Sequence, residues 1–310
     1  MALLKVRSLK VHYPIKNDIF GRTTDLIKAV NGVSLTIEPK ETVGIVGESA
    51  SGKSTLGKAI MGITKITSGI ILFEGKDISK TIKKRRSLYR KNVQMIFQDA
   101  HTSFNPRKKT SDIIAEPLRN FKKQTKAEEQ KQIDELLSLT GLSGEYASKY
   151  PAELSDEQKL RIAIARSIAL KPKLLIMDEP VFGFDLTEQA QILNCLKDVQ
   201  TALGFSCIFI SRDLSTAHFM CERLAILHNA RFVEIGTKND IFDNPTHIYT
   251  KQLIAAMPYI NPSIRDQTIA RRTAVAAEYE SQRNNYYKNE TEIYNLKPLS
   301  ETHYAALPSV

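Results

Sequence analysis

Nine residues decide the fold of this chain: Gly47-Glu48-Ser49-Ala50-Ser51-Gly52-Lys53-Ser54-Thr55. They fit the pattern G-x-x-x-x-G-K-[ST], with a β-branched run at residues 42–46 before it and a helix-forming stretch through about Met61 after it. In this pattern the backbone N–H groups of the loop and the helix start point at phosphates. Lys53 reaches the β- and γ-phosphates, and the Ser54 hydroxyl ligates Mg²⁺. The sequence therefore predicts a nucleotide site between a buried strand and a helix.

An acidic pair supplies the second half of such a site. The apolar run at residues 174–177 predicts a strand, and Asp178 and Glu179 follow it directly. We expect Asp178 to hold Mg²⁺ through water and Glu179 to polarise an attacking water. Alone, such a pair is more typical of a turn or a helix N-cap, but together with Lys53 it indicates nucleotide hydrolysis.

About 120 residues separate these two motifs, too many for a simple crossover connection. Residues 93–97 predict another strand, with Gln98 at its end. Residues 128–139 have helical periodicity, and Leu154-Ser155 opens a second helical run over residues 156–170. We therefore expect an α-rich insertion inside an α/β core. Before the phosphate loop, residues 26–38 predict extended segments with a hairpin turn at Asn31-Gly32.

Composition excludes several classes of protein. The chain has 310 residues, of which 42% are hydrophobic, and this excludes a disordered chain and a collagen-like fibre. No run approaches the roughly 18 apolar residues of a membrane span, and Lys5 and Arg7 interrupt the first apolar stretch, so we expect the protein to stay in the cytoplasm. The cysteines lie in apolar surroundings without metal-ligand spacing and predict reduced core residues: Cys195, Cys207 and Cys221.

The net charge of +10 allows nucleic acid, an anionic membrane surface or a phosphate-rich ligand as a partner. The basic residues cluster at residues 83–86, 107–109 and 271–272. Each cluster taken alone is typical of a solvated helix face.

The order of these parts resembles that of the ATP-binding subunits of ABC transporters. Phosphate loop, glutamine-ended strand, helical insertion, Leu-Ser helix start and acidic strand follow one another in that family. Asp185 falls where the family has its D-loop aspartate, and residues 210–214, with Arg212 at their centre, fall on the segment of the switch histidine.

Further motifs resemble the oligopeptide/dipeptide importer branch, and the tail is similar to the F-type subunit of Gram-positive systems. The resemblance covers roughly residues 1–262. The motifs that carry it are Val11-His12-Tyr13-Pro14, Phe97-Gln98-Asp99, Phe104-Asn105-Pro106-Arg107, residues 189–194 and residues 244–250. The resemblance implies an α/β fold: a P-loop ABC ATPase core with an antiparallel β subdomain and an inserted α-helical subdomain at about residues 99–170. We interpret residues 263–310 as a C-terminal extension folded back on the core or on a neighbouring ATPase.

The resemblance also implies partners. The family forms a head-to-tail heterodimer with a second ABC ATPase subunit, in which ATP and Mg²⁺ lie between the Walker motifs of one chain and the Leu-Ser signature of the other. Closure on ATP moves two membrane permease subunits, and an extracytoplasmic peptide-binding protein delivers the substrate. The chain would then lie at the cytoplasmic face of the cell membrane as a peripheral subunit, without direct contact with peptide or nucleic acid.

Residue roles follow from the same resemblance. Glu179, Gln98 and Arg212 are implied as catalytic residues, and Gln98 joins Ser54 and Asp178 as a Mg²⁺ ligand. Ser155 belongs to the signature that meets the partner's ATP. Tyr13 stacks on adenine or, alternatively, anchors the first strand.

The chain departs from the family at its signature. Asp156 and Glu157 replace two glycines whose bare backbone, in the family, approaches the γ-phosphate of the partner's ATP. A carboxylate about 4 Å from a phosphate charge is repelled by roughly 4 kcal/mol at an effective dielectric constant near 20. Arg212 replaces the switch histidine, and Phe182-Gly183-Phe184 replaces Ser-Ala-Leu. We therefore expect a chain that binds ATP and Mg²⁺ but hydrolyses slowly. Ala50 stands where the family usually has glycine. Alanine fits there if the backbone has an ordinary conformation, which we expect.

Two other functions stay open at this point. Nickel or metallophore importers use nearly the same subunit sequence. A soluble ABC ATPase acting on nucleic acid or ribosomes is compatible with the basic charge, although the chain has one cassette and neither a long coiled coil nor paired cysteines.

Overall fold

The computed structural model describes residues 1–16, 23–79, 86–100, 103–121, 123–257, 265–288 and 292–308. The chain divides into two compact units. The first contains Met1–Glu38, Thr42–Ser79 and Phe209–Val310, and the second contains Pro39–Glu41 and Lys80–Ile208. The expected domain boundary at residue 262 and the basic residues 83–85 lie outside the described residues. Within the described ranges, no helix is both long and apolar enough to cross a membrane.

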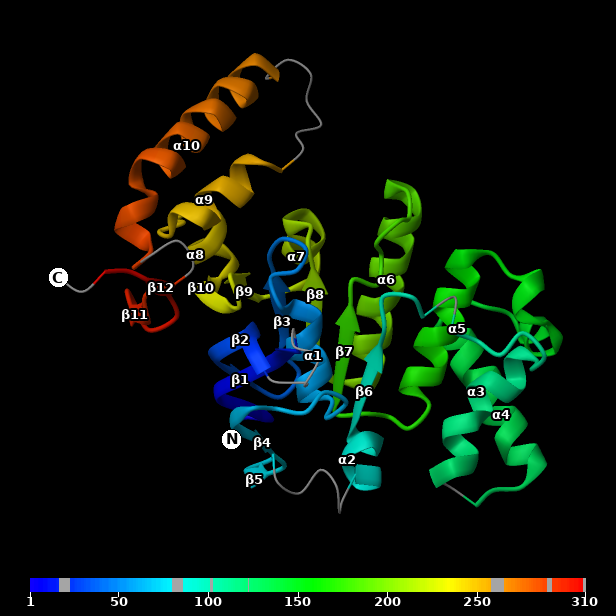
Figure 1. The fold of residues 1–310 in the computed structure, drawn as a ribbon. Coiled ribbons are helices and arrows are strands. Elements are labelled where there is room, and N and C mark those ends of the chain that lie inside the picture. Colours follow the sequence, from blue (N-terminus) through cyan, green and yellow to red (C-terminus); the bar gives the residue numbers. More distant parts are fainter. Residues whose placement is uncertain are drawn as a thin grey trace. The chain divides into compact units, whose positions relative to one another are not determined.

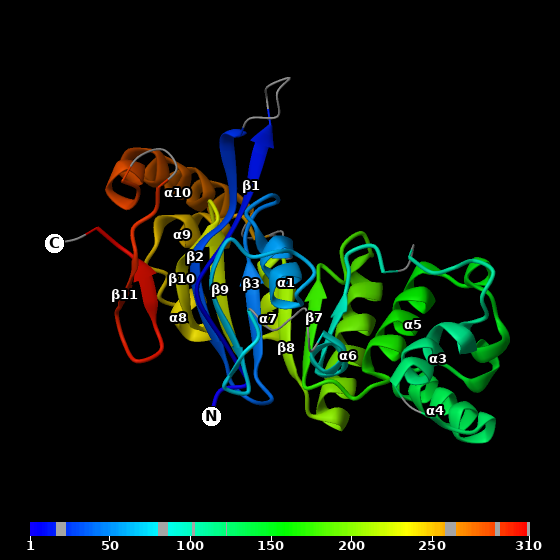
Figure 2. The ribbon, with the colours of Figure 1, turned by 60° about the horizontal axis from the view of Figure 1, so that its bottom comes forward.

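An antiparallel sheet forms one part of the first unit (Figure 2). Its strands follow the order β2-β1-β4-β5 and comprise β1 (Leu4–Lys16), β2 (Thr23–Ile37), β4 (Ser68–Phe73) and β5 (Lys76–Asp77). Alternate residues of β1, such as Leu4 and Val6, are buried, as expected for a sheet with one face on the core. This sheet confirms the expected antiparallel β subdomain.

The predicted hairpin turn at Asn31-Gly32 is wrong, because β2 continues through both residues. Leu9 of β1 pairs with Val33, whereas Lys10 pairs with Asn31, so Gly32 falls between two paired positions as an extra residue. Its φ of +81° is the left-handed conformation that glycine adopts in one type of β-bulge. The same freedom of glycine that suits a hairpin turn thus serves a bulge inside a long strand.

A second group of strands in the first unit carries the phosphate loop. The strand β9 (Arg223–His228) pairs in parallel with β3 (Thr42–Val46) and antiparallel with β10 (Arg231–Thr237). The expected strand at residues 42–46 is therefore confirmed. The helices of this unit are α1 (Lys53–Ile60), α7 (Leu214–Met220), α8 (Lys238–Phe242), α9 (Ile248–Ala255) and α10 (Arg265–Tyr286) (Figure 1).

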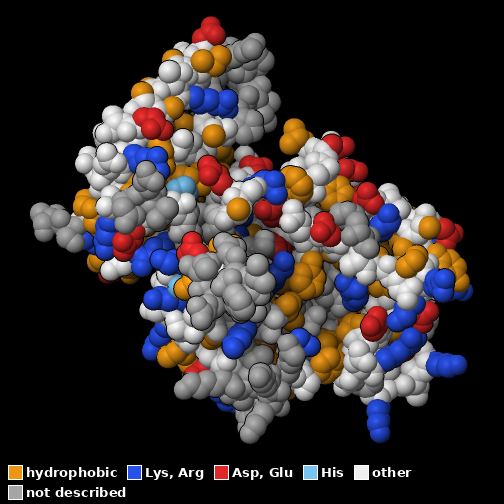
Figure 3. Space-filling model, viewed as in Figure 1, with side chains coloured by type: hydrophobic (Ala, Val, Ile, Leu, Met, Phe, Trp, Pro, Cys, Tyr) orange, Lys and Arg blue, Asp and Glu red, His pale blue; other side chains and the backbone are white. Residues whose placement is uncertain are grey.

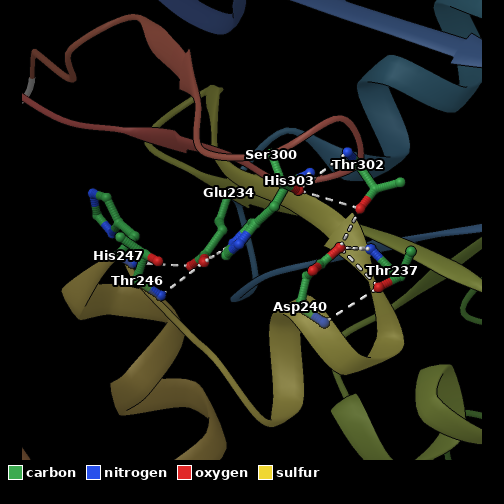
Figure 4. A network of polar contacts seen from close by, with 8 residues as sticks. All are labelled: Glu234, Thr237, Asp240, Thr246, His247, Ser300, Thr302 and His303. Carbon is green, nitrogen blue, oxygen red and sulfur yellow. Dashed lines mark hydrogen bonds and ion pairs between the residues drawn. The ribbon is translucent and has the colours of Figure 1, made fainter.

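The C-terminal segment extends this group of strands. The strand β12 (Tyr304–Ala306) pairs with β10, and β11 (Leu296–Pro298) pairs with β12. Two side-chain contacts fix the loop between them, since Thr302 Oγ1 lies 3.0 Å from Asp240 Oδ2 and His303 Nε2 lies 2.7 Å from Glu234 Oε1 (Figure 4). The described residues after 292 are therefore bound to β10 and the start of α8.

The second unit combines parallel strands with helices. Its strands β6 (Val93–Ile96) and β7 (Leu174–Asp178) pair in parallel, and the division between the two units falls within β8 (Ser206–Ser211). The helices are α2 (Arg86–Asn92), α3 (Thr110–Phe121), α4 (Lys126–Leu139), α5 (Asp156–Ile168) and α6 (Leu186–Leu203), with 3₁₀ turns at Gly144–Ser148 and Pro151–Glu153. The predicted strands and helices of this region are confirmed.

Local capping explains where these helices start. Thr125 accepts the N–H of Glu128 at the start of α4, and the Glu128 carboxylate accepts the N–H of Thr125 in return. Asp185 caps α6 in the same way. The three cysteines are buried thiols, as predicted.

The basic clusters behave differently from one another. Charged side chains of both signs are interspersed over the α3 and α4 region (Figure 3), where Lys108 pairs with Glu116 and Arg119 pairs with Asp112. Arg272 is exposed, as expected for a solvated face, and it also donates to the carbonyl oxygens of Ala255, Ala256 and Met257 at the end of α9.

Candidate nucleotide-binding site

The phosphate loop closes around its own lysine. Lys53 is only 3% exposed, and its Nζ donates to the carbonyl oxygens of Gly47 at 2.7 Å and Glu48 at 2.6 Å. The Ser51 hydroxyl lies 3.4 Å from the same Nζ. The cationic group is thus held at the centre of the loop.

Two glycines of the loop leave no room for a side chain. A Cβ atom on Gly47 would lie 2.1 Å from the carbonyl oxygen of Leu227, and one on Gly52 would lie 2.0 Å from that of Ala29. Gly52 also has a φ of +106°, which side chains rarely tolerate. The loop is therefore a backbone cradle of the kind that suits a polyphosphate.

The helix after the loop begins without a capping side chain. Gly52 is the N-cap residue of α1, and it has no side chain with which to cap the first turn. The first N–H groups of a helix need acceptors outside the helix, and an anion supplies them. Ser54 and Thr55, both half-buried, stand on this first turn.

Ala50 has a conformation that the sequence did not indicate. Its φ is +62°, in the left-handed region, so the expectation of an ordinary backbone conformation is wrong. A left-handed residue with a Cβ is strained by roughly 1–2 kcal/mol relative to glycine. Ala50 lies between Glu48 and Ser51, which both contact Lys53 Nζ, so this turn of the backbone is part of the loop around the lysine.

In the second unit, β7 delivers the acidic pair. Asp178 is the last residue of the strand, Glu179 follows it, and both are buried. Glu179 has a φ of +49°, a local backbone strain of the kind found at functional positions. Gln98 Nε2 lies 3.5 Å from Glu179 Oε2, so the structure brings these two predicted residues together.

The start of α5 carries the altered signature. Ser155 is the N-cap residue, and it exchanges hydrogen bonds with Gln158 in a capping box. Each of the following carboxylates has a cation beside it, because Asp156 lies 2.9 Å from Lys159 Nζ and Glu157 lies 2.8 Å from Arg161.

Sequence reasoning missed the pair of Glu157 and Arg161, although its signal was present. Glu157 and Arg161 stand four residues apart on a helix, the spacing at which side chains meet. Arg161 also donates to the carbonyl oxygen of Thr140 at 2.8 Å. The salt bridge at Glu157 is therefore tied to the end of α4 as well.

The remaining predicted residues lie on exposed positions of the first unit. Tyr13 on β1 is 41% exposed, so its ring is accessible to a ligand. Arg212 is exposed and lies between β8 and Asp213, which caps α7.

Comparison with known proteins places the chain in a family. Residues 30–182 match the family described as ABC transporter, and residues 233–284 match the family described as oligopeptide/dipeptide transporter, C-terminal region. The oligopeptide transport ATP-binding protein OppF of Lactococcus lactis subsp. lactis is 48% identical over 99% of this chain and 96% of its own length. The dipeptide transport ATP-binding protein DppF of Escherichia coli is 39% identical over 86% of this chain and 80% of its own.

Solved structures agree on the fold. The chain is similar to cbiO1 of Clostridium perfringens, part of the ABC transporter complex cbiONQ, with a TM-score of 0.66 and 29% identity over 81% of this chain and 95% of the other. It also matches the ATP-binding cassette MJ0796, solved as a dimer with ADP and Pi, with a TM-score of 0.67 and 24% identity over 76% and 98% of the two chains. Together with the phosphate loop, these findings show that the chain belongs to the ATP-binding proteins of the oligopeptide/dipeptide ABC transporter family and is an ABC-type ATPase.

Proposed function

We propose that this chain binds MgATP through the phosphate loop. The closed cradle around Lys53 supports this proposal, because Gly47 and Gly52 admit no side chain and Gly52, the N-cap residue of α1, makes no side-chain hydrogen bond to the first turn. Lys53 contacts the β- and γ-phosphates, and Tyr13 stacks on adenine.

We also propose which residues would hold Mg²⁺ and which residue would activate the attacking water. Mg²⁺, when bound, neutralises charge on the β- and γ-phosphates. The oxygens of Ser54, Gln98 and Asp178 are the hard donors that this ion prefers. Glu179 accepts a proton from the attacking water, and the contact with Gln98 supports a shared role for these two residues.

The partners follow from the family. We propose a heterodimer with a second ABC ATPase subunit, in which Ser155 meets the partner's ATP. The pair drives two membrane permease subunits that receive peptide from an extracytoplasmic binding protein, and it lies peripherally at the cytoplasmic face of the membrane. OppF and DppF are named for oligopeptide and dipeptide transport, which favours peptide over nickel or a metallophore as the cargo.

We also propose that hydrolysis is slow. Asp156 and Glu157 add side chains at a helix start where the family has bare backbone, and the salt bridges with Lys159 and Arg161 hold those side chains in place. The salt bridges reduce the charge repulsion toward a phosphate but leave the bulk of the side chains. Arg212 cannot adopt the neutral form of a histidine near pH 7.

The test measures nucleotide binding and turnover together. The purified chain, alone and mixed with its partner ATPase, is expected to bind MgATP, to lose binding on Lys53→Ala, and to turn over slowly. The reference is the partner ATPase mixed with a variant of this chain that carries Asp156→Gly, Glu157→Gly and Arg212→His. We expect faster turnover in this reference mixture. Turnover of the unmodified mixture equal to this reference, with half or more of it lost on Glu179→Gln, would overturn the proposal of slow hydrolysis.

A further inference from the structure

A tyrosine of α9 contacts the phosphate loop. The backbone N–H of Glu48 donates to Tyr249 Oη, with 3.1 Å between N and O. The two residues are 201 positions apart in the sequence. Tyr249 belongs to the segment 244–250 that distinguishes the peptide importer branch, and the function proposed above gives it no role.

The contact falls on a particular peptide unit. The N–H of Glu48 and the carbonyl of Gly47 belong to the same planar peptide group, so they turn together. That carbonyl accepts a hydrogen bond from Lys53 Nζ at 2.7 Å. Tyr249 therefore accepts a hydrogen bond from the N–H of the same peptide group whose carbonyl oxygen accepts one from Lys53.

The tyrosine ring is fixed in its turn. Tyr249 is 1% exposed, and its ring stacks on His228 with 3.9 Å between ring centroids. Burial raises the pKa of Tyr249, so its hydroxyl stays protonated, and burial lowers the pKa of His228 to about 4, so this ring is neutral at pH 7. His228 follows Leu227, whose carbonyl meets Gly47, so the loop and the tyrosine share the end of β9 as a support.

The extension after residue 265 supports the helix that carries Tyr249. At the start of α9, His247 Nδ1 accepts the N–H of Tyr249 at 3.1 Å, and the rings of Tyr286 and Tyr287 pack edge-on against His247. At its end, Arg272 of α10 donates to the last carbonyls of α9. The two helices lie side by side in both ribbon views (Figures 1 and 2).

We propose that Tyr249 is a positioning residue for nucleotide binding: its hydroxyl fixes the Gly47–Glu48 peptide so that the loop is shaped for phosphate before ATP arrives. This inference rests on the proposed binding of MgATP at the phosphate loop. Without the hydroxyl, the peptide can rotate, and the nucleotide must order it on binding. A pre-ordered loop avoids that loss of entropy.

The variant Tyr249→Phe tests the hydroxyl while it keeps the ring. Loss of one hydrogen bond predicts that the Kd for Mg²⁺ and a non-hydrolysable ATP analogue rises roughly three- to ten-fold. The matched control is Tyr287→Phe, which removes a buried hydroxyl that lies 3.4 Å from Tyr279 Oη in the same aromatic cluster. We expect less than about a two-fold change for the control. Equal Kd values for the two variants, or tighter binding by Tyr249→Phe, would overturn the proposal.

Amide hydrogen exchange separates positioning from a general loss of stability. In Tyr249→Phe, we expect faster exchange over residues 45–51 than in Tyr287→Phe, with similar thermal midpoints for the two variants. Should either variant fail to fold, the unmodified chain still decides, because its Glu48 amide must be protected from exchange. A freely exchanging Glu48 amide contradicts the contact.

The two proposals fail in distinguishable ways. An unmodified chain that does not bind the nucleotide analogue contradicts the proposed function, whatever Tyr249 does. An unmodified chain that binds it, loses binding on Lys53→Ala and is unaffected by Tyr249→Phe contradicts this inference alone.

Discussion

Glu234 Oε1 lies 2.7 Å from His303 Nε2 in the interior of the first unit, where Glu234 is 0% exposed (Figure 4). The same carboxylate accepts the N–H groups of Thr246 at 2.8 Å and His247 at 3.0 Å. One buried acid thus joins β10, the start of α9 and the C-terminal loop. A buried carboxylate requires such donors, because it has lost its contact with water.

Removing this acid should destabilise the first unit. We expect Glu234→Ala to lower the free energy of unfolding by about 3 kcal/mol, since it removes the partner of the His247 and Thr246 N–H groups and of the His303 ring. Urea denaturation of the full chain measures the effect. The matched control is Glu301→Ala, an exposed acid two residues before His303, for which we expect a change below about 0.5 kcal/mol. A similar small change for Glu234→Ala would contradict the structural role of this carboxylate.

The left-handed backbone at Ala50 gives a second prediction. Ala50→Gly relieves strain of roughly 1–2 kcal/mol and loses part of that gain, about 0.4–1 kcal/mol, to the freer unfolded chain. We therefore expect the free energy of unfolding to rise by about 0.5 kcal/mol. At Ala127, exposed in the first turn of α4, the same substitution should lower it by about 0.5–1 kcal/mol. Denaturation curves that shift in the same direction for both variants would contradict the strain at Ala50.

The sequence predicted those parts of the site that depend on local pattern. The phosphate loop, the strand ending at Asp178 and the helix start at Ser155 each combine an apolar run with a short polar motif. Such motifs need no knowledge of distant residues, since the loop, strand and cap are determined by neighbours in the chain. The assignment of individual site residues to ATP and Mg²⁺ stays a prediction.

Other features could not be predicted, for physical reasons. Asn31-Gly32 favours positive φ in a hairpin turn and in a bulge alike, and only the pairing with β1 distinguishes the two. The positive φ of Ala50 belongs to the folded loop around Lys53, and alanine as a residue type favours no such conformation. The contact between Tyr249 and Glu48 joins residues 201 positions apart, beyond the reach of any local periodicity.

Restoring glycine at the signature should raise turnover and lower stability. In the proposed heterodimer, we expect Asp156→Gly with Glu157→Gly to increase ATP hydrolysis several-fold, because the backbone at the start of α5 is then bare. The same change removes two salt bridges and places two glycines in a helix. Each glycine should lower the free energy of unfolding by about 1 kcal/mol. A phosphate-release assay and thermal unfolding measure the two effects.

The start of α4 offers a matched control for this variant. Glu128 and Glu129 also stand in the first turn of a capped helix of the second unit. Replacing both by glycine should lower stability in the same direction and leave turnover unchanged. Increased hydrolysis in the α4 variant, or unchanged hydrolysis in the α5 variant, would contradict a specific effect of Asp156 and Glu157.

Two histidines, of which His247 is buried and His228 is half-buried, make the first unit sensitive to acid. Burial lowers the pKa of His228 to about 4, with a smaller effect of the Arg283 cation, and burial lowers that of His247 to about 3, with a smaller effect of His228. An unfolded histidine has a pKa of about 6.5. As the pH falls below this value, the unfolded chain takes up protons that the folded chain does not, so acid favours unfolding.

We therefore expect the free energy of unfolding to fall between pH 7.5 and pH 5.5, by about 1.4 kcal/mol for each of these histidines. The loss continues until the pH approaches the folded-state pKa values near 4 and 3. His228→Phe keeps a ring for Tyr249 to stack on but cannot be protonated, so its stability should fall by about 1.4 kcal/mol less over the same range. Urea denaturation of both proteins at the two pH values gives the comparison, in which the carboxylates common to both cancel. Equal losses would show that His228 titrates normally in the folded chain.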